Sequence, residues 1–123
     1  MKTKILVADD EPFIGRSLSY VLERSGYEVF LAKDGEEALR LAEEVKPAVA
    51  ILDVMMPGKT GFEVCQQIRC NPHLRKTRII ILSAKGQASD FREGAEAGAD
   101  AYLPKPFSPV QIIELVRGFL DEG

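Results

Sequence analysis

The chain has 123 residues, of which 46% are hydrophobic and 28% are charged, and its formal net charge is −3. This length and composition predict one globular domain with a hydrophobic core of its own. The acidic balance argues against a broad nucleic-acid surface, which would need a basic patch, but it leaves room for a small local patch.

Apolar segments of strand length alternate with helix-period segments along the whole chain. Five strands are predicted, over residues 4–8, 28–32, 48–52, 78–82 and 101–103. Five helices are predicted, over residues 13–25, 35–46, 61–70, 88–97 and 109–120. This alternation predicts an α/β fold with a doubly wound parallel sheet, right-handed crossovers and helices on both faces.

Two adjacent carboxylates, Asp9 and Asp10, directly follow the apolar segment ILVA at residues 5–8. Two charges 4 Å apart repel by about 4 kcal/mol if the effective dielectric is about 20. Taken alone, the pair could equally be an N-terminal cap of the following helix. If the pair lies close to the interior, a counter-charge must compensate it.

Further polar side chains follow the other predicted strands. Asp53 ends the third strand, Ser83 follows the fourth and Lys105 comes two residues after the fifth. In an open parallel sheet, ligands bind beyond the carboxyl ends of the strands. Each residue alone could be a turn former, a cap or a solvated side chain, but their convergence on one edge favours a site.

The residue types at this edge suit phosphate chemistry. Clustered carboxylates bind a hard divalent cation such as Mg²⁺ through oxygen. Lys105 and the Ser83 hydroxyl could hold the oxygens of a phosphoryl group. A carboxylate can itself be the nucleophile, and Asp53 is the best candidate because it ends the most apolar strand.

The chain resembles the response-regulator receiver domain over essentially its full length. The resemblance rests on four motifs together, namely ILVADDEP, AILDVMMPGKTG at 50–61, IIILSA at 79–84 and GADAYLPKPF at 98–107. It implies a flavodoxin-like fold with five helices and strand order 2-1-3-4-5. It also implies a single receiver domain over residues 1–123.

The resemblance assigns roles to the acidic residues. Asp53 matches the phosphate acceptor, and Asp10 and Asp53 match the carboxylate ligands of Mg²⁺. Asp9 matches a carboxylate that acts through a metal-bound water. The backbone carbonyl of Met55 matches the third protein ligand.

The same motifs imply a catalytic pair and a switch. Ser83 and Lys105 match the residues that contact the phosphoryl group. Tyr102 matches an aromatic side chain that rotates inward when Ser83 moves toward the phosphate. The peptide between Lys105 and Pro106 is expected to be cis.

The implied function is a phosphorylation switch of a two-component or phosphorelay system. A sensor histidine kinase or a histidine phosphotransfer protein would supply the phosphoryl group. The domain would not be an enzyme, except toward its own phosphoryl transfer and autodephosphorylation. We expect an unknown downstream effector, no direct contact with nucleic acid or membrane, and a monomer or a phosphorylation-dependent dimer.

Three other functions stay open. A receiver-like docking module that is never phosphorylated would have the same fold. A Mg²⁺-dependent phosphohydrolase with an aspartyl-phosphate intermediate usually needs a second Asp two residues after the nucleophile, where this chain has Met55. A flavin or nucleotide binder needs a phosphate loop rich in Gly, Ser or Thr after the first strand, where this chain has the acidic DDEPFIG.

The remaining features indicate a cytoplasmic protein. No apolar segment reaches the roughly 20 residues that span a bilayer, and Asp9 and Asp10 interrupt the first segment too early for a signal peptide. Cys65 and Cys70, five apart on a predicted helix, diverge and are expected to be reduced thiols. The only histidine, His73, is expected at the surface.

Overall fold

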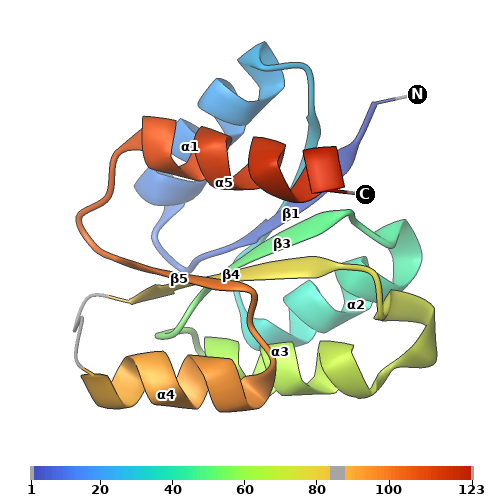
Figure 1. Cartoon of the computed structure of the whole chain (residues 1–123), viewed down its shortest axis with the longest axis vertical. Helices are drawn as coiled ribbons and strands as arrows, with labels where there is room; N and C mark the ends of the chain where they lie inside the picture. The colour runs from blue at the N-terminus through green and yellow to red at the C-terminus, as the bar shows by residue number, and fades with distance from the viewer. Residues whose placement is uncertain (1, 84–87, 123) are drawn as a thin grey trace.

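The computed structural model describes residues 2–83 and 88–122, apart from the side chains of residues 88–91 and 122. Five strands form one parallel sheet in the order β2-β1-β3-β4-β5, which confirms the predicted fold class (Figure 1). The strands are β1 Lys4–Ala8, β2 Glu28–Ala32, β3 Val49–Asp53, β4 Arg78–Ser83 and β5 Ala101–Pro104. The helices are α1 Pro12–Arg24, α2 Gly35–Val45, α3 Gly61–Cys70, α4 Ala88–Ala97 and α5 Pro109–Glu122.

The predicted boundaries agree with these for four elements and differ by one or two residues for the others. The first helix begins at Pro12 rather than at residue 13, because a proline suits the first turn, where its missing N–H has no partner to lose. The fourth and fifth strands each extend one residue further, to Ser83 and Pro104. A short 3₁₀ turn, η1 Pro72–Leu74, lies where the sequence indicated only a loop.

The helices form one layer on each face of the sheet. Figure 1 shows α1 and α5 on one face and α2, α3 and α4 on the other. A buried apolar cluster fills each interface, one around Leu18, Leu22 and Val116, the other around Val64, Cys65 and Ile68. Every residue of the central strand β3 is buried, as a strand covered on both faces requires.

Local sequence fixes where α2 and α3 begin. The Asp34 carboxylate accepts a hydrogen bond of 2.8 Å from the backbone N–H of Glu37 at the start of α2. At the start of α3, Thr60 and Glu63 form a reciprocal capping box, each side chain accepting from the other residue's backbone N–H. These caps fix the residues at which the two helices begin.

The carboxyl ends and the amino ends of the strands lie on opposite sides of the molecule, which we call the carboxyl edge and the opposite edge of the sheet. In Figure 1 the strands run from right to left, so that their carboxyl ends lie on the left and both chain termini on the right.

Within residues 2–83 and 88–122, no helix has the length and apolar character needed to cross a membrane.

Candidate functional site

The sheet register places the predicted site residues at neighbouring strand ends. Asp53, the last residue of β3, pairs with Leu82 of β4, and Ser83 ends β4 beside Pro104. The backbone N–H of Asp9 continues the β1–β2 ladder by donating to Ala32 O at 3.0 Å. The residues therefore converge on the carboxyl edge, as the sequence predicted.

Three carboxylates form the centre of this edge. One oxygen from each of Asp9, Asp10 and Asp53 can be chosen so that all lie within 4.8 Å of one another. Asp9 is 6% exposed and Asp53 3%, whereas Asp10 faces solvent. Oxygen ligands at this spacing, with one side open to water, are the donor set that a hard divalent cation prefers. The acidic residues thus fit such an ion.

Lys105 brings a positive charge into the same cluster. Its ammonium nitrogen lies 3.2 Å from Asp53 Oδ2 and 3.3 Å from Asp9 Oδ2. It also lies 3.7 Å from the exposed Glu11 carboxylate, a contact that the sequence did not predict. The Lys105 backbone N–H donates to Ser83 O at 2.7 Å, and the Lys105–Pro106 peptide is cis, as expected.

The pKa values of Asp53 and Lys105 are both shifted from their ordinary values. Burial of Asp53, reinforced by the nearby Asp9 carboxylate and opposed by Lys105, raises its pKa to about 6. Burial acts to lower the pKa of Lys105, but the Asp53 and Asp9 carboxylates outweigh it, so that its pKa is raised. At neutral pH the edge therefore holds an ammonium among carboxylates, with Asp53 mostly ionised.

The carboxylate pair is not simply a helix cap. The N-cap of α1 is Glu11, and its side chain makes no capping hydrogen bond. Asp9 Oδ1 accepts from the backbone N–H of Glu11 at 2.8 Å, while Asp9 Oδ2 contacts Lys105. Asp9 therefore serves both the turn into α1 and the charged cluster.

The loop after β3 is held close to Asp53. The Met55 backbone N–H donates to Asp53 Oδ1 at 3.3 Å, and the Met55 side chain is 63% exposed. A Cβ on Gly61 would lie 2.5 Å from the Asp53 carbonyl oxygen, so only glycine fits this position. The close approach fixes the loop that carries Met55 beside the carboxylate.

Ser83 and Tyr102 lie on the two strands that border the site. Ser83 is buried, and Tyr102 on β5 is half-buried against the apolar cluster under α3. Tyr102 pairs in register with Ile81, two residues before Ser83 on the neighbouring strand. Ala84, the last residue of the IIILSA motif, lies outside the described residues.

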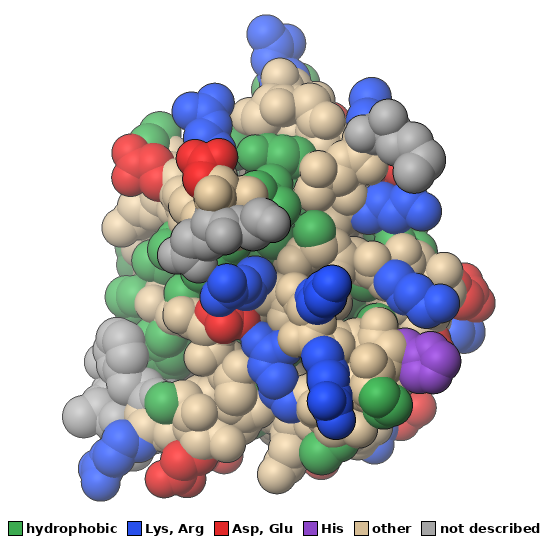
Figure 2. All heavy atoms as spheres, turned by 45° about the vertical axis from the view of Figure 1, so that its right-hand side comes forward, with side chains coloured by type: hydrophobic (Ala, Val, Ile, Leu, Met, Phe, Trp, Pro, Cys, Tyr) green, Lys and Arg blue, Asp and Glu red, His purple; other side chains and the backbone are tan. Residues whose placement is uncertain are grey.

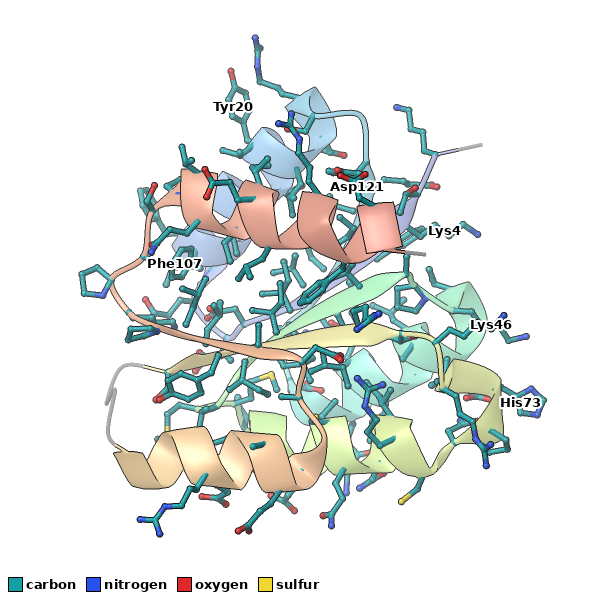
Figure 3. All side chains as sticks on the ribbon, in the orientation of Figure 1. Lys4, Tyr20, Lys46, His73, Phe107 and Asp121 are labelled. Carbon is teal, nitrogen blue, oxygen red and sulfur yellow. The ribbon has the colours of Figure 1, made fainter. Side chains whose placement is uncertain are left out.

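The other predicted side chains lie away from this edge. Cys65 is buried and its thiol donates to Ala97 O at 3.4 Å, whereas Cys70 is exposed. Both are free thiols, as predicted. His73 is exposed in η1, near the amino ends of the strands (Figure 3).

Comparison with known proteins gives one consistent family. The family model described as the response regulator receiver domain matches residues 5–117. The chain is 48% identical to the alkaline phosphatase synthesis transcriptional regulatory protein PhoP of Bacillus subtilis, over 98% of this chain and 49% of that protein. It is 44% identical to the transcriptional regulatory protein ResD of the same organism, over 97% of this chain and 48% of that protein.

Solved structures agree with this family. The structure of the chemotaxis response regulator CheY4 of Vibrio cholerae matches with a TM-score of 0.90 and 34% identity, covering 97% of this chain and 99% of that one. The response regulator DrrB of Thermotoga maritima, an OmpR/PhoB homologue, matches with a TM-score of 0.89 and 34% identity, covering 99% of this chain and 54% of that one. The chain spans about half the length of the curated relatives it matches. By sequence and by fold, the chain belongs to the response regulator receiver domain family.

Proposed function

We propose that this domain, over residues 1–123, is a phosphorylation switch that accepts a phosphoryl group on Asp53. The observation that supports this most directly is the position of the buried Asp53 carboxylate, 3.2 Å from the Lys105 ammonium and within a cluster of carboxylate oxygens. A buried, mostly ionised carboxylate beside a cation and an open acidic edge is suited to nucleophilic attack on phosphorus.

The residues that would hold Mg²⁺ are Asp10, Asp53 and the Met55 carbonyl, with Asp9 acting through water. The carboxylate spacing and the exposure of Asp10 support this assignment. When bound, the ion would offset the negative charge of the carboxylates and of the phosphoryl oxygens.

The transfer itself would be carried out by the chain's own groups. An Asp53 carboxylate oxygen forms a bond to phosphorus as the bond between phosphorus and the donor's histidine nitrogen breaks, and the imidazole leaves with the electron pair. Lys105, which forms an ion pair with Asp53 in the structure, would stay charged and stabilise the phosphoryl oxygens. The Ser83 hydroxyl donates to another phosphoryl oxygen.

The signal would pass from Ser83 to Tyr102. Movement of Ser83 toward the phosphoryl group would open space that the half-buried Tyr102 ring enters, altering the surface around β5. Couplings of this kind typically amount to about 1 to 3 kcal/mol, so phosphorylation would shift a population between two states. Tyr102→Ala should therefore uncouple partner binding from phosphorylation while leaving phosphate uptake intact.

The phosphate donor is proposed to be a sensor histidine kinase or a histidine phosphotransfer protein in the cytoplasm. The names of PhoP and ResD describe those relatives as transcriptional regulatory proteins, and each is about twice as long as the matched region. We propose that this domain contacts neither nucleic acid nor membrane itself and controls a separate effector. Its only chemistry would be its own phosphorylation and dephosphorylation, as a monomer or a phosphorylation-dependent dimer.

Intact mass spectrometry after incubation with acetyl phosphate tests the proposal. We expect one added phosphoryl group on the parent when Mg²⁺ is present, and none after chelation or in Asp53→Asn. An Asp121→Asn variant, altered at an exposed position of α5, serves as the matched control and should behave like the parent. A folded parent that takes up no phosphate under any condition would contradict the proposal and favour a docking module.

A further inference from the structure

A hollow at the opposite edge of the sheet has no part in the proposed function. It has a volume of about 740 Å³ and is formed by the amino end of β1, the turn between α2 and β3, and the segment after η1. Figure 3 shows Lys4, Lys46 and His73 on this side of the molecule. Because β1 rises about 3.3 Å per residue, Lys4 lies roughly 16 Å from Asp9. The hollow is therefore separate from the acidic edge.

The lining of this hollow is strongly basic. It contains Lys2, Lys4, Lys46, Lys76 and His73, with Glu28 as the carboxylate in the lining. Figure 2 shows several Lys and Arg side chains gathered on the face that carries the histidine. A second hollow continues from it past Lys76 to Arg75. On a chain of net charge −3, this is a local concentration of positive charge.

The lysines that line this hollow have no acidic partner among the residues that the structure describes. Among the described residues, no carboxylate lies within 4.0 Å of the ammonium groups of the lining lysines. Some cations elsewhere do have such partners, namely Arg40, Lys59, Arg69, Arg78 and Lys105. Like charges gathered without partners repel one another, and an anion in the hollow would relieve that repulsion.

Lys46 also occupies a backbone position that disfavours it. It ends α2 with φ +51° and ψ +65°, in the left-handed region where glycine is the usual residue. A side chain other than glycine costs energy there. The positive charge of Lys46 is favourable at the C-terminus of α2, and Lys46 is one of the residues that line the hollow.

We propose that this hollow binds a compact anion carrying several phosphate groups. Lysine ammonium groups bind phosphate as mobile point charges. The volume lies in the range of small-molecule sites, about 300 to 1,000 Å³. Apart from His73, the lining includes no aromatic side chain on which a nucleic-acid base could stack, which favours a small polyphosphate over a nucleic-acid strand.

Sodium tripolyphosphate is the probe for the first test, titrated into the metal-free protein at low salt and followed by two-dimensional NMR and calorimetry. We expect saturable shifts at residues 2–4, 46–48 and 73–77, and weaker affinity as salt increases. The double variant Lys4→Gln with Lys46→Gln removes two of the four lysine charges of the lining and should bind at least tenfold more weakly, which corresponds to about 1.4 kcal/mol. The double variant Arg92→Gln with Arg117→Gln loses the same charge at exposed positions outside the hollow and should bind almost like the parent.

Lys46→Gly separates binding from folding. Glycine suits the left-handed position, so the midpoint of thermal unfolding should not fall, while affinity for tripolyphosphate should. Shifts confined to the Lys105 edge, or an equal loss in the arginine control, would overturn the proposal. A DNA duplex that binds the same residues and is not displaced by tripolyphosphate would overturn it in favour of a nucleic-acid surface.

Discussion

The Lys105 ammonium and the Asp53 carboxylate meet at 3.2 Å, although they come from the ends of strands that are not neighbours in the sheet. Both side chains are largely shielded from solvent. A cation held in this position offsets part of the charge of two buried carboxylates, because Asp9 lies 3.3 Å away from the same nitrogen. This relationship determines both the stability of the edge and the chemistry proposed for it.

Replacing Asp53 with Asn should stabilise the metal-free protein at neutral pH. In the folded protein the pKa of Asp53 is raised to about 6 from an ordinary value of 3.8. Between these two pH values the folded state therefore retains a proton that the unfolded chain has released. The resulting stabilisation is fully present below about pH 4 and is lost as pH rises through about 6.

Denaturant unfolding of the parent and Asp53→Asn should show this as a pH-dependent difference. We expect the variant to be more stable by about 1 to 3 kcal/mol at neutral pH and by almost nothing near the ordinary pKa of Asp. Asp121→Asn should show no such trend. A difference between parent and Asp53→Asn that stays constant with pH would mean that burial does not shift this carboxyl group.

Mg²⁺ should raise the thermal unfolding midpoint of the parent, because a ligand that binds only the folded state stabilises it. At about 100 times its dissociation constant, the expected gain is about 2.7 kcal/mol. Asp10→Asn removes an exposed carboxylate of the cluster and should reduce this response. Calorimetry with and without a chelator measures the change in the unfolding midpoint. A midpoint unaffected by millimolar Mg²⁺ would refute the metal assignment.

Lys105→Met should destabilise the protein by roughly 3 to 5 kcal/mol at neutral pH, because it leaves Asp9 and Asp53 buried without their counter-charge. Mg²⁺ should restore part of the loss. Lys59→Met is the matched control, since Lys59 pairs at 3.5 Å with the exposed Glu36 and should contribute less than about 1 kcal/mol. An equal loss of stability in the two variants would show that the Lys105 ion pairs stabilise the protein no more than the exposed Lys59 pair does.

Two glycines should respond to alanine in opposite directions. A Cβ at Gly61 would lie 2.5 Å from the Asp53 carbonyl oxygen, so Gly61→Ala should displace the loop and cost several kcal/mol. At Gly118, in α5, a Cβ meets nothing within 4 Å, and Gly118→Ala should stabilise the helix by about 0.5 to 1 kcal/mol. Chemical denaturation measures the free energy of unfolding of both variants. A Gly61→Ala variant as stable as the parent would contradict the close approach of this loop to Asp53.

The two thiols should react at very different rates. Burial raises the pKa of Cys65 to about 11, which keeps its thiol protonated, whereas Cys70 is exposed. Native protein should therefore react with a thiol reagent at one cysteine quickly and at the second only after denaturation. Peptide mapping identifies the modified residue, and rapid labelling of Cys65 would show that α3 opens readily.

The sequence predicted this edge well because strand ends are local features. Asp53 and Ser83 follow apolar segments whose length and composition indicate buried parallel strands, and parallel strands bring their carboxyl ends together. The contact between Glu11 and Lys105 was not predicted, because it depends on where α1 begins relative to β5.

Other contacts between segments that are far apart in the sequence were not predicted either. The Arg69 guanidinium on α3 donates to Gly98 O at 2.7 Å and to Thr77 O at 2.6 Å, and pairs with Asp100. These bonds tie α3 to the start of β4 and to the turn before β5. The helical period of α3 places Arg69 near its exposed side, and only the assembled fold shows which carbonyl groups lie within its reach.

Direct identification of the modified residue tests the central claim most sharply. After incubation with acetyl phosphate and Mg²⁺, borohydride reduction would convert an aspartyl phosphate to homoserine, which peptide mass spectrometry locates in the chain. The account predicts homoserine at position 53 and at no other aspartate, with none formed when Mg²⁺ is chelated. Homoserine at Asp9 or Asp10 instead, or an unreduced Asp53 in protein that has gained a phosphoryl group, would contradict it.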